Sequence, residues 1–181
     1  MNQVFKIVVT GPFNSGKTTF ISAISEIDVV STEKSTGKGK KKCNTTVAMD
    51  FGRITFPDGY CLHLYGTPGQ DRFDFMWEIL SEGMLGYVVL VDGSKPESFS
   101  EVAGIVNAFR KMSDKPCVVG LTRSDRKDCV APAKVRKDID HLGELDIVEC
   151  DARKLADVKE VLLALMERVV ERAEAIEKAA G

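Results

Sequence analysis

A segment near the start of the chain has residue types and spacing suited to holding phosphate groups. Residues 11–18 read Gly-Pro-Phe-Asn-Ser-Gly-Lys-Thr, which matches the pattern G-x-x-x-x-G-K-[ST]. Successive backbone N–H groups in such a segment form a concave anion-binding loop at the start of a helix. Gly11 and Gly16 allow backbone conformations and close approaches that a Cβ atom would obstruct. The segment therefore predicts a phosphate-binding loop, the alternative being a glycine-bearing turn with an incidental lysine.

Side chains of this loop can also take part in chemistry. We expect Lys17 to reach the β- and γ-phosphates of a nucleotide and the Thr18 hydroxyl to bind Mg²⁺. The other phosphate contacts that we expect from the loop come from Asn14, Ser15, Gly16 and Thr19.

A carboxylate further along the chain can choose the base. Asp125 follows a buried apolar run at 117–121, and ligand sites in open α/β sheets form at the carboxyl ends of strands. A carboxylate can accept parallel hydrogen bonds from guanine N1–H and the 2-amino group, whereas adenine has no matching pair of donors. The stem of Arg123 would pack over the base, and Ala152 could donate its N–H to guanine O6. The residues favour guanine; taken alone, Asp125 is as easily a solvated loop acid or a helix cap.

Alternating apolar runs and amphipathic segments must position these residues. Strands are expected at 4–9, 46–56, 61–65, 87–91, 117–121 and 147–150, with a hairpin turn at 57–59. Helices are expected from about residue 15, at 77–85, 96–112 and 131–141, and from about residue 155 onward. The pattern predicts an α/β fold with a mostly parallel six-stranded sheet, one antiparallel edge strand and about five helices on both faces.

Composition narrows the classes of function. The length of 181 residues fits a single domain over 1–181. A net charge of −2 argues against a global basic surface for nucleic acid, and no apolar run approaches the length of a transmembrane segment. The five cysteines are scattered and the N-terminus lacks the features of a secretory signal, so we expect a cytoplasmic protein.

The order of the motifs resembles that of the Ras-like small GTPases, which share the P-loop NTPase fold, over nearly the whole chain. The segments that carry the resemblance are the P-loop, Thr46, Gly66-Thr67-Pro68-Gly69-Gln70, Thr122-Arg123-Ser124-Asp125 and Asp151-Ala152-Arg153. Residues 46–51 look like the first switch of Rab- and Arf-type members. Residues 66–70 look like a prokaryotic branch near the MglA-type gliding-motility and signal-recognition-receptor-β-like GTPases.

The resemblance implies roles for particular residues. Thr46 would bind Mg²⁺ and sense the γ-phosphate, Gly69 would offer its N–H to the γ-phosphate, and Gln70 would orient the attacking water. The residues that would bind the base are Thr122, Arg123, Asp125, Ala152 and Arg153.

The chain departs from the family's pattern most clearly at Gly66, where members of the family usually have an aspartate. That aspartate supports Mg²⁺ from outside its direct ligands, so its loss is expected to weaken metal binding. No arginine is an obvious catalytic finger, and Arg53 and Arg72 are weak candidates.

These observations predict a GTP-binding molecular switch that hydrolyses GTP to GDP and phosphate with Mg²⁺, using Lys17, Thr46 and Gln70. Its intrinsic rate is expected to be slow and partner-stimulated. One alternative is a nucleotide-binding docking subunit with negligible hydrolysis, which Gly66 supports. Another is an ATP-using phosphotransferase, which Asp125 disfavours.

Two segments are the expected contacts for a protein effector, activator and exchange factor, namely residues 31–46 and 66–77. The first is too polar to pack alone, so a γ-phosphate and Mg²⁺ could order it. The lysines within 38–42 leave two interpretations open: a solvated loop, or electrostatic contact with an acidic partner or a membrane surface.

Overall fold

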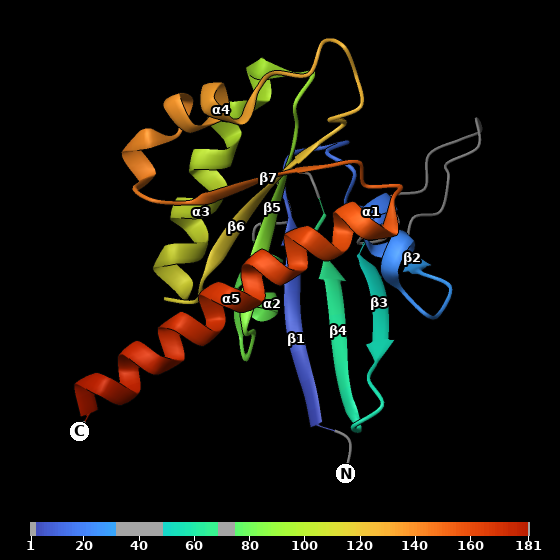
Figure 1. The fold of residues 1–181 in the computed structure, drawn as a ribbon, viewed down its shortest axis with the longest axis vertical. Helices are drawn as coiled ribbons and strands as arrows, with labels where there is room; N and C mark the ends of the chain where they lie inside the picture. The colour runs from blue at the N-terminus through green and yellow to red at the C-terminus, as the bar shows by residue number, and fades with distance from the viewer. Residues whose placement is uncertain (1–2, 32–48, 69–74, 181) are drawn as a thin grey trace.

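One mixed sheet organises the part of the chain that the structure, a computed structural model, describes: residues 3–31, 49–68 and 75–180 (Figure 1). Seven strands form it in the order β2-β3-β4-β1-β5-β6-β7. The strands are β1 (Gln3–Thr10), β2 (Val30–Ser31), β3 (Asp50–Thr55), β4 (Tyr60–Gly66), β5 (Gly86–Asp92), β6 (Cys117–Thr122) and β7 (Asp146–Cys150). The helices are α1 (Lys17–Ile24), α2 (Phe75–Ser81), α3 (Phe99–Met112), α4 (Pro132–Asp138), α5 (Leu155–Ala180) and the 3₁₀ turns η2 (Pro96–Ser98) and η3 (Asp140–Leu142).

The directions of the strands confirm the predicted α/β class. Strands β4, β1, β5, β6 and β7 pair in parallel, each joined to its neighbour along the sheet. β3 is antiparallel to β4, as expected for a hairpin whose turn ends at Gly59 with φ of 81°. The two-residue β2 adds a further antiparallel pair outside β3. The six predicted strands are therefore present, with a short seventh at the edge.

Helices cover both faces of the sheet. α1 and α5 pack against one face, and α2, α3 and α4 lie on the other (Figure 1). Alternate side chains of β1 divide between the two cores because a strand points successive residues to opposite faces: Ile7 and Val9 join one and Val8 the other. In α5, Val158, Val161, Leu162 and Leu165 are buried against the sheet, whereas Val170, further along the helix, is 53% exposed.

Helix boundaries differ from the prediction by a few residues. The helix expected at 77–85 ends at Ser81, and Gly83 then adopts φ of 67°, which breaks the helical path. Pro96 begins a 3₁₀ turn that leads into α3. The helix expected at 131–141 is split into α4 and η3.

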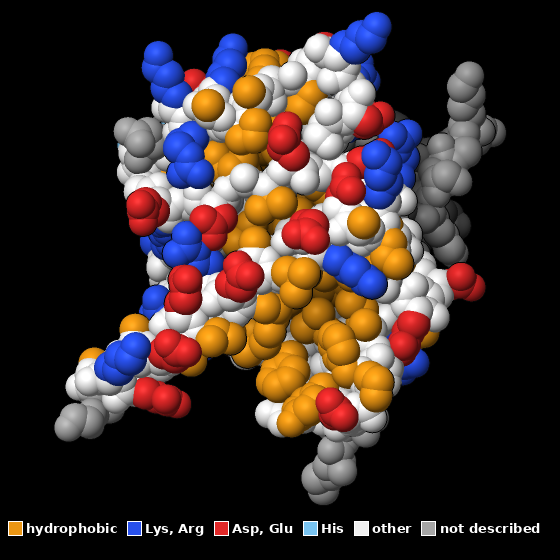
Figure 2. Space-filling model, in the orientation of Figure 1, with side chains coloured by type: hydrophobic (Ala, Val, Ile, Leu, Met, Phe, Trp, Pro, Cys, Tyr) orange, Lys and Arg blue, Asp and Glu red, His pale blue; other side chains and the backbone are white. Residues whose placement is uncertain are grey.

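An apolar surface remains at the amino ends of β1 and β4, where Figure 2 shows hydrophobic side chains gathered beside α5. Phe5 and Tyr60 stack there with ring centroids 5.8 Å apart, and Tyr60 is 43% exposed. α1 is eight residues long and no described helix lies over this end of the face. The surface is at the opposite end of the strands from the loops that carry the motifs.

Those motif-bearing loops follow β1, β6 and β7. The carboxyl ends of the parallel strands lie together at one edge of the sheet, since Asp92 pairs with Thr122 and Thr122 with Cys150. This topology brings residues 11–19, 122–126 and 151–153 to a common edge. No helix in the described ranges is long and apolar enough to cross a bilayer.

Candidate functional site

The loop between β1 and α1 has the backbone expected of a phosphate-binding loop. Gly11 and Gly16 adopt φ of 141° and 99°, and Gly16 is the N-terminal cap of α1. A Cβ on Gly11 would collide with the carbonyl oxygen of Leu90. Asn14 also has a positive φ, of 61°, a left-handed conformation that asparagine adopts more readily than most other non-glycine residues. The loop is therefore a constrained structure rather than a simple turn.

Lys17 places a positive charge at the loop. Its side chain is buried, and Nζ donates hydrogen bonds to the carbonyl oxygens of Gly11 and Pro12, both at 2.8 Å. A buried ammonium group needs such partners because its desolvation is costly. Together with the amides at the N-terminus of α1, this charge makes the loop attractive to anions.

A cavity of about 250 Å³ lies along the loop. It is lined by Phe13, Asn14, Ser15, Gly16, Lys17, Thr18, Thr19, Asp50, Thr67 and Pro68. Thr18 Oγ1 donates a hydrogen bond to Asp50 Oδ2 at 2.5 Å, and Asp50 is 8% exposed. We did not predict a role for Asp50 from the sequence. The available signal was that it is the sole acidic residue in the run 46–56, at the start of β3.

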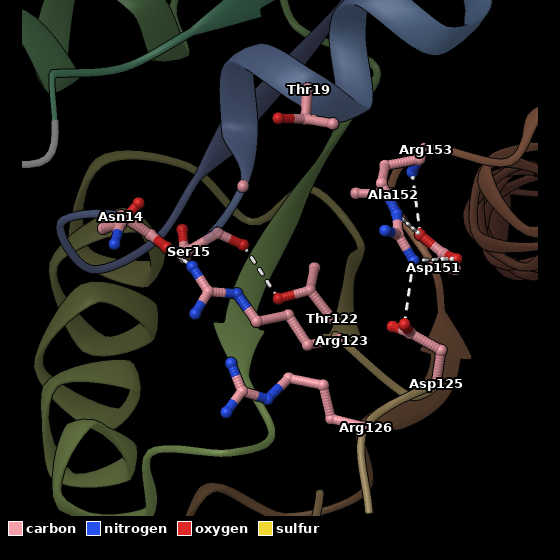
Figure 3. Close-up of a pocket in the computed structure, with 11 residues that line it drawn as sticks. Asn14, Ser15, Thr19, Thr122, Arg123, Asp125, Arg126, Asp151, Ala152 and Arg153 are labelled. Carbon is pink, nitrogen blue, oxygen red and sulfur yellow. Dashed lines mark hydrogen bonds and ion pairs between the residues drawn. The ribbon is translucent and has the colours of Figure 1, made fainter.

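A second cavity, of about 410 Å³, adjoins the first and brings together the three motif-bearing loops (Figure 3). It is lined by Asn14, Ser15, Gly16, Thr19, Thr122, Arg123, Asp125, Arg126, Asp151, Ala152 and Arg153. Nine of these are residues that the sequence analysis assigned to nucleotide binding. Arg126 and Asp151 are additions, and Arg126 had no distinguishing signal in the sequence.

Thr122 connects β6 to the phosphate-binding loop. Its buried hydroxyl donates to the carbonyl oxygen of Ser15 at 2.8 Å (Figure 3). The carbonyl oxygen of Val91 lies 3.1 Å from the same hydroxyl and can share its hydrogen. The contact spans 107 positions of sequence between Thr122 and Ser15. Thr122 thus holds the two ends of the candidate site at a defined separation.

Arg123 contacts both the phosphate-binding loop and the end of β5. Its backbone has φ of 60°, Nη1 forms an ion pair with Asp92 Oδ2 at 2.8 Å, and Nη2 donates to the carbonyl oxygen of Asn14 at 3.2 Å. The guanidinium therefore reaches across to the loop, and Arg123 is also one of the residues that line the cavity.

Arg153 links the two acidic residues of the cavity (Figure 3). It donates from Nε and Nη2 to the carboxylate of Asp151, both at 2.8 Å, and from Nη2 to Asp125 Oδ2, also at 2.8 Å. The hydrogen bonds from Arg153 lower the pKa of Asp151 to about 2, and they raise the pKa of Arg153. Asp125 is more open, with 40% of its side chain exposed, so its carboxylate is accessible from the cavity.

Several predicted residues lie outside the described ranges. They are Thr46, Gly69, Gln70 and Arg72, together with most of the predicted partner segment 31–46 and the middle of 66–77. Arg53 is described: its Nε pairs with Glu26 Oε1 at 2.8 Å, and it lines neither cavity. Its geometry gives no support to a catalytic role.

The described residues contain no cluster of three or more His, Cys, Asp or Glu side chains that could hold a metal ion by themselves. The hydroxyl of Thr18, which donates its hydrogen to Asp50, nevertheless suits Mg²⁺, since this ion prefers oxygen ligands and usually keeps several waters and substrate phosphates. A magnesium ion that arrives with a nucleotide would fit this end of the groove.

Comparison with known proteins places the chain in a family. The model of the family described as "Conserved hypothetical ATP binding protein" matches residues 27–178, so the chain belongs to that family. The matched range begins after the phosphate-binding loop and contains Asp125 and residues 151–153.

Individual relatives extend the comparison. The chain is 40% identical over 90 residues to an uncharacterized protein of Methanocaldococcus jannaschii, and this alignment spans half of the chain and 52% of that relative. It is 26% identical to the Ras-related protein Rab-3 of Caenorhabditis elegans over 98% of the chain and 80% of the relative. It is 25% identical to human Ras-related protein Rab-3A over 94% of the chain and 76% of the relative. These long alignments support a Ras-like relationship.

Proposed function

Starting from this family membership, we propose that the chain is a guanine nucleotide-binding switch that hydrolyses GTP slowly to GDP and phosphate. The observation that carries the proposal is the pair of adjoining cavities. They join an anion-binding loop at one end to an accessible carboxylate at the other, through three loops at the carboxyl edge of the sheet. A nucleoside diphosphate or triphosphate has matching chemistry, with a polyanion at one end and a hydrogen-bonding base at the other.

The phosphate end uses the backbone amides of residues 14–18 and the charge of Lys17. Thr18 is the described residue that would hold Mg²⁺, with Thr46 proposed as a second hydroxyl ligand. A bound Mg²⁺ supplies charge neutralisation on the β- and γ-phosphates.

At the other end of the site, Asp125 is the residue proposed to select the base. Its carboxylate can accept from guanine N1–H and the 2-amino group, while the N–H of Ala152 can donate to guanine O6. Adenine presents an acceptor at N1 where guanine presents a donor, so a carboxylate would face a lone pair. This reasoning favours guanine, although the family's description speaks of ATP.

Hydrolysis depends on how the attacking water is positioned relative to the γ-phosphate. Gln70 is proposed to orient the attacking water and Gly69 to donate its N–H to the γ-phosphate. No arginine among the described residues lines the phosphate cavity, so we expect a slow intrinsic rate, and a partner protein that contacts 31–46 or 66–77 could raise it by roughly 10³- to 10⁵-fold. On residues 66–70, we place the chain near the MglA-type and signal-recognition-receptor-β-like branch and expect it to act in the cytoplasm.

Two other functions remain as alternatives. A docking subunit that binds nucleotide with negligible hydrolysis is favoured by Gly66, where the usual aspartate is missing. An ATP-using phosphotransferase is favoured by the family's description and opposed by Asp125.

The deciding experiment is to purify the protein gently, release its nucleotide with acid and identify it by chromatography. Guanine nucleotide is expected, and ATP displacing bound GDP at equal concentration would overturn the base assignment. Single-turnover hydrolysis with and without excess Mg²⁺ then separates the switch from the docking subunit. Phosphate release no faster than that from free GTP, under every condition, would leave only the docking function.

A further inference from the structure

Gly66 and Asp50 are direct partners across two antiparallel strands. The last residue of β4 pairs with the first residue of β3. An ideal Cβ atom on Gly66 would lie 3.0 Å from Cβ of Asp50 and 3.3 Å from its Oδ2. The carboxylate of Asp50 therefore fills the space that a side chain at position 66 would enter.

That carboxylate is directed at the phosphate-binding loop. Asp50 Oδ2 accepts a hydrogen bond from Thr18 Oγ1 at 2.5 Å, and Asp50 is 8% exposed. Asp50 and Thr18 line the same cavity, beside Thr67 and Pro68, which follow Gly66 in the chain.

We propose that Asp50 supplies, from β3, the carboxylate that supports Mg²⁺ at Thr18, in place of the side chain absent at Gly66. The inference rests on the proposed binding of a magnesium-bound nucleotide. A threonine hydroxyl has one hydrogen and two lone pairs, so donating that hydrogen to Asp50 leaves its lone pairs for a cation. Asp50 would also place a negative charge near a Mg²⁺ ion held by Thr18. It is a positioning residue that acts through Thr18.

A carboxylate supplied by Asp50 leads to an expectation for Mg²⁺ binding opposite to the one that position 66 alone suggests. Loss of an aspartate there predicts weak Mg²⁺ binding. If the carboxylate has moved to the neighbouring strand, the protein should depend on Mg²⁺ as strongly as a protein that has kept it.

The test measures how much Mg²⁺ slows the release of fluorescent GDP, by comparing dissociation rates in Mg²⁺ and in EDTA. Asp50→Asn should reduce this Mg²⁺ effect, the ratio of the two dissociation rates, by about tenfold or more. The matched control is Asp58→Asn, which removes a carboxylate from the exposed turn between β3 and β4 and should behave like the parent protein.

A swapped pair, in which the residues at positions 50 and 66 are exchanged, distinguishes loss of the metal support from a general loss of folding. Asp50→Gly should lose the Mg²⁺ effect, and the combination of Asp50→Gly with Gly66→Asp should restore it. Of the three atoms nearest to a Cβ at position 66, two belong to the side chain of Asp50, and the third is Ile21 Cδ1 at 3.0 Å, the movable end of a side chain.

The outcomes separate the two proposals. A parent protein that binds no guanine nucleotide would overturn the proposed function itself. A parent that binds GDP, together with an Asp50→Asn variant that keeps the full Mg²⁺ effect, would overturn the role of Asp50. If Asp50→Asn also releases GDP faster in EDTA, the swapped pair decides: recovery supports the role, and no recovery overturns it.

Discussion

Nη2 of Arg153 lies 2.8 Å from Oδ2 of Asp125, so the carboxylate proposed to select the base is already held by a guanidinium. The same arginine is anchored by Asp151, which is almost fully buried. A carboxylate has about four lone-pair sites, so Asp125 can keep this hydrogen bond and still accept from a base. Arg153 thus orients Asp125 from the side of β7.

Removing Arg153 should weaken nucleotide binding modestly. Arg153→Ala is expected to raise the Kd for GDP by up to about fivefold, since exposed ion pairs are screened by solvent and contribute little. Isothermal titration measures this change. Arg126→Ala is the matched control, because Arg126 lines the same cavity but pairs with Asp128. Equal losses in the two variants would contradict the orienting role.

Replacing Asp125 should change which base is preferred. In Asp125→Asn the new amide can donate to the 2-oxo group of xanthine where the carboxylate accepted from the 2-amino group of guanine. GDP affinity should fall at least about tenfold, since a hydrogen bond to a charged group is worth about 1.5–3 kcal/mol. Competition between GDP and xanthosine diphosphate measures the change. Unchanged GDP affinity would show that Asp125 does not read the base.

The hydroxyl of Thr122 should matter for both stability and binding. Thr122→Val keeps the shape but leaves the buried carbonyl oxygen of Ser15 without this donor, at a cost of about 1–3 kcal/mol in the free energy of unfolding. GDP affinity should fall as well, because the loop loses its connection to β6. Urea unfolding and GDP titration measure the two effects, with Thr122→Ser as the variant that retains the hydroxyl. If Thr122→Val and Thr122→Ser have the same stability and the same GDP affinity, the hydrogen bond to Ser15 contributes to neither.

Gln70 provides the test of hydrolysis. Gln70→Leu should slow single-turnover hydrolysis while GTP binding is preserved, because leucine cannot orient water. The comparison uses phosphate release from pre-bound GTP, with the affinity for a non-hydrolysable GTP analogue as the control. Equal rates in the variant and the parent would mean that another group positions the water.

The lowered pKa of Asp151 predicts that the free energy of unfolding depends on pH in the acidic range. Arg153 lowers the pKa of Asp151 to about 2, below the value of about 3.9 expected in the unfolded chain. Its contribution is therefore present above about pH 4 and is lost as the pH falls toward 2. Asp151→Asn should be less stable than the parent near pH 7, and urea unfolding should show this gap closing between pH 4 and 2. The control variant is Asp58→Asn, which removes a carboxylate from the exposed turn between β3 and β4.

The local sequence pattern was sufficient to predict the phosphate-binding loop and most of the strands of the sheet. Residues 11–18 carry their conformation in their own glycines, and β-branched runs with helical spacing between them identify the alternating elements. The convergence of Asn14, Asp125 and Ala152 could also be expected, because parallel strands place their carboxyl ends at one edge. Helix ends were less accurate, since α4 and η3 divide where backbone geometry changes without a strong sequence signal.

Contacts between side chains far apart in the chain depended on the assembled sheet. The amino-acid order alone shows an aspartate missing at position 66, and it takes the pairing register of β3 with β4 to reveal Asp50 in the same space. The hydrogen bond from Arg153 to Asp125 likewise arises only when the loops after β6 and β7 meet. Motifs are local and can be read along the chain, whereas cross-strand neighbours are set by strand order and register, which belong to the whole fold.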